Sequence, residues 1–167
     1  SYSEKKKQML GDDFTAAVDL IKEDDIDTAL IALERITDKA SDGYVTMAKM
    51  KKAAILIEKK EIDEGLSIYE DLERTAVDQS FKDMSSILFI LNAIDHRSSD
   101  ELITRVDRLT LNSSWKFSAL ELKGFIFLKD RKYDEAKEIF NEIIKLRNAP
   151  STLAGRARDM LDYIEGK

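Results

Sequence analysis

The chain has 167 residues, of which 43% are apolar and 36% charged, with one proline, six glycines and no cysteine. This length supports one sizeable core, so we expect a single domain, and the scarcity of proline and glycine favours an all-α fold over a β-sandwich. The 33 acidic and 27 basic residues give a net charge of −6, which argues against nucleic acid as a partner. The absence of cysteine excludes disulfides, thiolate catalysis and cysteine metal sites.

The first predicted element is a charged helical lead-in over residues 1–11, in which Lys5, Lys6 and Lys7 follow one another. We expect this lysine run to be a solvated face. At the end of this lead-in, Gly11, Asp12 and Asp13 are typical of a helix break or cap. A new helix is therefore predicted to begin at Phe14.

Helical spacing of apolar residues predicts the helices that follow. Phe14, Ala17, Val18 and Ile21 fall at the i, i+3, i+4, i+7 positions of an amphipathic helix, and the same pattern recurs along the chain. Polar hinges are expected at residues 23–25, 59–61 and 129–132, and Ser98 or Ser99 is expected to cap a helix. The helices are predicted at residues 14–21, 26–40, 44–57, 62–72, 81–94 and 100–109, in the two halves of residues 117–150, and at 150–164.

Four of these segments share one register. Small or apolar anchors at Ala29, Gly65, Leu102 and Ala136 are separated by 36, 37 and 34 residues. This period resembles that of the tetratricopeptide repeat (TPR), a helix hairpin of about 34 residues. We therefore predict a TPR-like α-solenoid of about four hairpins over residues 12–167, closed by a C-terminal capping helix.

The best-preserved hairpin, residues 117–150, shows why such a pattern packs. Gly124 lets the second helix of the hairpin approach the first, and Ala136 offers a small facing surface. Three aromatic residues, Phe127, Tyr133 and Phe140, are expected to fill the seam between neighbouring hairpins.

Three blocks carry a more specific resemblance: GYVTMAKM at residues 43–50, SWKFSALEL at 114–122 and APSTLAGRARDML at 149–161. Together they resemble the TPR-like domain of the ancillary SecYEG translocon subunit family, in the form common in alphaproteobacteria, over roughly residues 12–165. The resemblance implies an inner-membrane protein with one membrane helix upstream of residue 1 and this domain in the periplasm. It also implies association with translocon subunits and periplasmic chaperones, and no catalytic residue.

Candidate chemistry in the sequence is sparse. His96 is the single histidine and has no convergent partners for metal binding or proton transfer, so we interpret it as a basic group near a helix C-terminus. Carboxylate pairs such as Asp63–Glu64 and Asp134–Glu135 fall at hinges and first turns, where they favour the helix dipole. No phosphate-binding, dinucleotide or GxSxG motif occurs. We expect neither an enzyme nor a bound metal or cofactor.

The sharper candidate is a partner-binding inner face, which we define as the side formed by the first helices of the hairpins. Methionine on such a face suits adaptable contacts. The competing interpretation is that the hairpins curl tightly and the last helix buries this face as core. The candidates are Met47, Met50, Ile57, Met84, Ile87, Leu91, Glu121 and Phe125, with Ala54, Ile94, Ser118 and Leu128 beside them.

Two functions follow from these patterns. The first is a non-catalytic scaffold for protein–protein interaction, placed in the periplasm near the translocon by the family resemblance. The alternative is a soluble cytoplasmic TPR adaptor that binds a peptide or helix of a partner protein. A carboxylate clamp would need lysine and asparagine along the inner face, and its mainly apolar character disfavours that alternative.

Overall fold

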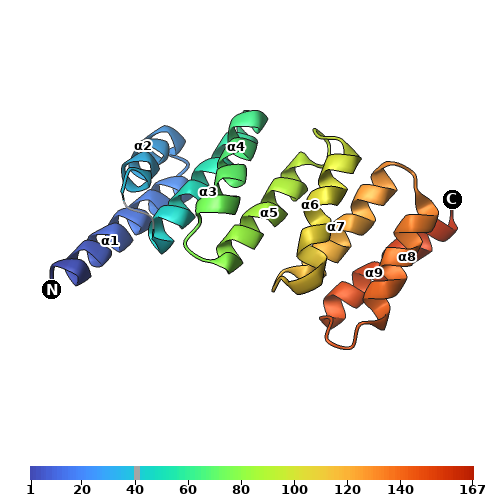
Figure 1. Ribbon diagram of the computed structural model, residues 1–167. Helices are drawn as coiled ribbons and strands as arrows, with labels where there is room; N and C mark the ends of the chain where they lie inside the picture. The colour runs from blue at the N-terminus through green and yellow to red at the C-terminus, as the bar shows by residue number, and fades with distance from the viewer. Residues whose placement is uncertain (40–41) are drawn as a thin grey trace. The chain divides into compact units, whose positions relative to one another are not determined.

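A computed structural model describes residues 1–39 and 42–167, which hold nine α-helices and no strand (Figure 1). The all-α prediction is confirmed. The chain divides into two compact units, Ser1–Ser85 and Ser86–Lys167, and the single domain expected for residues 12–167 stays a prediction. The helices are α1 (Tyr2–Lys22), α2 (Ile26–Thr37), α3 (Gly43–Glu58), α4 (Ile62–Thr75), α5 (Gln79–Ala93), α6 (Ser99–Asn112), α7 (Lys116–Lys129), α8 (Tyr133–Lys145) and α9 (Ser151–Glu165).

In the unit Ser1–Ser85, each helix packs against its neighbour in sequence: α1 against α2, α2 against α3, and α3 against α4, with α1 also touching α3. The apolar stripes of α1, α2 and α3 meet in one cluster of buried side chains, because each amphipathic helix can bury its stripe only against another helix. This is the packing of a helical repeat. The buried members are Leu10, Ala17, Leu33, Ile36, Val45, Ala48 and Ile55.

The unit Ser86–Lys167 follows the same plan, with α6 on α7, α7 on α8, and α8 on α9. The guanidinium of Arg105 on α6 lies 3.9 Å from the centre of the Phe89 ring on α5. The last helix also touches α7, so it closes the end of this unit. The buried cluster here comprises Leu120, Ala136, Ile139, Phe140, Ile143, Leu153, Ala157 and Ile164.

Three hinges have the same backbone geometry. Asp24, Lys60 and Arg131 each follow a first helix and adopt left-handed φ values of 60°, 69° and 57°. In each hinge the next residue donates its amide to the carbonyl five residues back, and this pattern is the Schellman motif that ends a helix. The three bonds are 2.9 Å each, from Asp25 to Leu20, from Glu61 to Leu56 and from Lys132 to Phe127. The predicted hinges are confirmed.

The third hairpin has a different hinge. Between α5 and α6 the amide of Arg97 donates to the carbonyl of Ala93, and the side chain of Ser98 accepts from the amide of Glu101 at 3.3 Å. Ser98 is therefore the cap of α6, one of the two serines predicted for this role.

Glycines allow close contact between paired helices. A Cβ atom added at Gly124 would lie 2.6 Å from Cζ of Phe140, and one added at Gly65 would lie 2.9 Å from the carbonyl oxygen of Ala53. Real Cβ atoms essentially never approach another heavy atom this closely, so any larger residue would push the helices apart. The close approach predicted at Gly124 is confirmed.

The predicted break at residues 11–13 is wrong. The first helix runs without interruption through Gly11, and Leu10 is buried in the core instead of belonging to a separate lead-in. Gly11 makes room for a neighbour: an added Cβ would lie 3.1 Å from the hydroxyl of Tyr44 on α3. The helix predicted to end at residue 40 ends at Thr37, and residue 40 lies outside the described residues.

Candidate partner-binding surfaces

The inner-face candidates on α3 are mostly covered. Met50 is buried, while Met47 and Ile57 are half-buried and Ala54 is exposed. The side chain of Ile57 reaches the backbone of Gly65 on α4, where an added Cβ would meet its Cγ1 at 2.5 Å. Ile57 is thus part of the packing between α3 and α4.

On α5 the candidates differ strongly in exposure. Ile87 is buried and Met84 is half-buried, as is Ile94 just beyond the helix, whereas Leu91 is 51% exposed. Only Leu91 presents a large apolar surface here.

On α7 the candidates are engaged by residues of α8 and α9. Arg156 of α9 makes a two-pronged ion pair with Glu121, with Nε 2.8 Å from Oε2 and Nη2 3.2 Å from Oε1. The hydrogen bond and the charge of Glu121 raise the pKa of Arg156. Phe125 packs edge-on to the ring of Phe140, with centroids 5.8 Å apart, and Ser118 and Leu128 are half-buried. The α7 candidates are therefore partly covered by α8 and α9, and none of these four residues is fully buried.

The groups considered for chemistry lie apart. His96 is exposed, and the pairs Asp63–Glu64 and Asp134–Glu135 occupy the first turns of α4 and α8. Among residues 1–39 and 42–167, no three His, Asp or Glu side chains are placed to hold a metal ion together.

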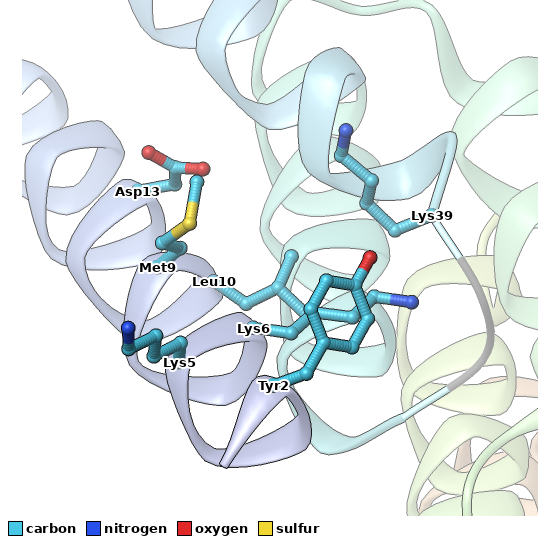
Figure 2. Close-up of a pocket in the computed structure, with 7 residues that line it drawn as sticks. All are labelled: Tyr2, Lys5, Lys6, Met9, Leu10, Asp13 and Lys39. Atoms are coloured by element: carbon cyan, nitrogen blue, oxygen red, sulfur yellow. The ribbon is translucent and has the colours of Figure 1, made fainter.

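A groove that the sequence did not predict lies between the first half of α1 and the end of α2. It has a volume of about 360 Å³ and is lined by Tyr2, Lys5, Lys6, Met9, Leu10, Asp13 and Lys39. Figure 2 shows Tyr2, Lys6 and Leu10 projecting from α1 toward the side on which Lys39 lies. Leu10 is buried at the base, while Tyr2 and Met9 are 85% and 65% exposed.

The sequence contains a pattern that indicates this groove, but the pattern overlaps the lysine run, which we interpreted as a solvated face. Tyr2, Met9 and Asp13 stand seven and four residues apart, so they share one face of the helix, and Lys6 lies between them on the same face. The helix break predicted at Gly11 separated this stripe from the core. With the helix continuous, the stripe extends directly from Leu10.

A second groove is polar. It lies among α2, α3 and α4, has a volume of about 280 Å³, and includes Glu34, Lys52 and Asp71. The ammonium of Lys52 already pairs with the Glu34 carboxylate at 2.5 Å. Two of the charged groups that line this groove are therefore paired with each other.

The fold and these surfaces define the class: an all-α protein with the packing of a helical repeat. Comparison with known proteins gives no matching family model, no matching curated protein and no matching solved structure. None of the helices in the described parts of the chain is long and apolar enough to cross a membrane.

Proposed function

We propose that this protein is a non-catalytic scaffold for protein–protein interaction, built as a TPR-like helical repeat. The observation that carries the proposal is the recurrence of one hinge geometry at Asp24, Lys60 and Arg131, joined to helices that pack on their neighbours in sequence. Repeats of this kind present extended surfaces to partners instead of a closed catalytic cleft.

The proposed place of action is the periplasmic face of a bacterial inner membrane, beside the secretion translocon and periplasmic folding factors. The support is the resemblance of residues 43–50, 114–122 and 149–161 to the ancillary translocon subunit family. A soluble cytoplasmic adaptor is the alternative. The two proposals differ in whether a protease added on the periplasmic side can digest the domain.

Crosslinking of the full-length protein in its native membranes tests the proposal. The expected result is recovery of translocon subunits or periplasmic chaperones above the background that is recovered with a control protein of similar size and opposite net charge. Protease added to spheroplasts should digest the domain. A domain protected from protease and free of these partners would overturn the periplasmic placement, and recovery of no partner in any compartment would overturn the scaffold itself.

A further inference from the structure

We infer that the groove between the first half of α1 and the end of α2 binds a peptide segment of a partner protein that carries an apolar side chain flanked by carboxylates. The inference rests on the proposed scaffold function and assigns it a site. It is carried by the exposed apolar side chains, by the charge of the rim and by the volume of the groove.

Exposed apolar side chains point to a binding surface. Tyr2 and Met9 are among the most exposed large apolar side chains in the described residues, and both line this groove. They continue the apolar floor formed by Leu10 (Figure 2). Covering such a contiguous apolar surface is favourable, and a partner's apolar side chain would do so.

The charge of the rim selects an acidic partner. Lys5, Lys6 and Lys39 stand around the groove against one carboxylate, Asp13. The lining of the groove therefore carries a local excess of positive charge, although the chain as a whole carries a net charge of −6. A basic rim attracts carboxylates and helps to orient a partner that carries them.

The volume of the groove suits a peptide side chain. A volume of about 360 Å³ lies near the lower end of the roughly 300–1,000 Å³ typical of small-ligand pockets. Such a volume takes one inserted side chain and its flanking groups. Leu10 at the base is 4% exposed and belongs to the helix core, so the accessible apolar surface of the groove comes from Tyr2 and Met9.

The test uses fluorescence anisotropy with the full chain and three short labelled peptides. One carries a central leucine pair flanked by glutamates, the second has glutamines in place of the glutamates, and the third has lysines. The variant Lys5→Glu/Lys6→Glu reverses the rim. The matched control Lys7→Glu/Lys51→Glu changes the net charge equally at exposed positions that do not line the groove.

We expect saturable binding of the glutamate peptide and about tenfold weaker binding of the glutamine peptide, because each exposed charge pair contributes modestly. The Lys5→Glu/Lys6→Glu variant should lose about tenfold in affinity, and the control should stay within about twofold. Met9→Ser should weaken both the glutamate and the glutamine peptides. Circular dichroism of every variant verifies that the helices remain.

Any of the following results would overturn the inference. The first is equal binding of the glutamate peptide to the wild type and the rim variant, or no saturable binding at all. The second is binding of phosphatidylglycerol vesicles, lost in the rim variant, with no binding of the peptide. The third is a concentration-dependent dimer that only the rim variant lacks. If wild type and rim variant crosslink to the same partners equally, the groove is not the binding site, whereas the proposed scaffold function is not contradicted.

Discussion

At the scale of single residues, two glycines in helix interiors differ in what surrounds them. A Cβ at Gly124 would meet the ring of Phe140 at 2.6 Å, whereas a Cβ at Gly155 has nothing within 4 Å. We expect Gly124→Ala to lower the free energy of unfolding by about 1–3 kcal/mol through overpacking. Gly155→Ala should raise it by about 0.5–1 kcal/mol, because alanine loses less backbone entropy in a helix.

Urea denaturation followed by circular dichroism measures both variants, and each serves as the control for the other. Equal effects of the same sign at the two positions would show that helix propensity decides, and would remove the steric explanation for Gly124.

A second residue-scale prediction concerns Tyr69, which is 2% exposed on α4. Burial raises the pKa of its phenol above the ordinary value of 10.0. The folded state therefore keeps the proton after the unfolded state has released it, so stability is complete below about pH 10 and falls as the pH rises further. Tyr69→Phe should lose less stability than the wild type between pH 9 and pH 11, to be measured by thermal unfolding at each pH.

In that experiment Tyr163, which is 49% exposed, supplies the control. Tyr163→Phe should retain the alkaline loss of the wild type. If the stability of Tyr69→Phe falls with pH as steeply as that of Tyr163→Phe, burial of Tyr69 is not the source of the alkaline loss of stability.

At the scale of elements, the hinge after α7 stores backbone strain. Arg131 holds φ at 57°, a conformation that costs a non-glycine residue about 1–2 kcal/mol. Glycine removes this cost, but it also raises the conformational entropy of the unfolded chain, which cancels part of the gain. Arg131→Gly should therefore raise the free energy of unfolding by up to about 1 kcal/mol.

The neighbouring Asp130 is the matched control, because its φ is −88° and glycine offers no conformational advantage there. Asp130→Gly should be neutral or destabilising in the same denaturation assay. A stabilising effect of both substitutions, or of neither, would contradict the role given to Arg131.

The elements were predictable where local chemistry alone decides. The hinges at Asp24, Lys60 and Arg131 were located from polar residues between apolar stripes, and their hydrogen bonds are local to the hinge. The break at Gly11 was wrong because the decisive contact, with Tyr44, comes from a helix distant in sequence. A glycine that ends a helix and one that admits a neighbouring ring look alike in a single sequence.

The candidate site shows the same limit. Helical register placed Glu121 and Phe125 on the first helices correctly, but it could not show that Arg156 and Phe140 already engage them. The groove beside α1 went unpredicted because it also needs Lys39, which follows the next helix. Surfaces made by two helices require the packing to be known.

At the scale of the whole molecule, most helix contacts join helices adjacent in sequence, so we predict that the damage done by a substitution stays local. Gly65→Ala strains the pair α3 and α4 in the unit Ser1–Ser85, and Gly124→Ala strains α7 and α8 in the unit Ser86–Lys167. Hydrogen exchange followed by mass spectrometry should show about tenfold faster exchange in the strained pair and little change in the other unit.

Each variant again controls the other in that measurement. Uniformly faster exchange along the chain in both variants would show that the protein unfolds as one cooperative body, and would contradict the repeat-like division of stability.

The contact between Gly124 and Phe140 also constrains how the sequence can drift. Alanine at position 124 becomes tolerable once residue 140 is smaller, for example leucine. If Gly124→Ala arises first, the single variant is overpacked, and if Phe140→Leu arises first, the single variant has a cavity. Gly65 lacks this route, since the oxygen that it faces belongs to the backbone of Ala53 and no substitution removes it. The first glycine belongs to an exchangeable pair, and the second is fixed by the main chain.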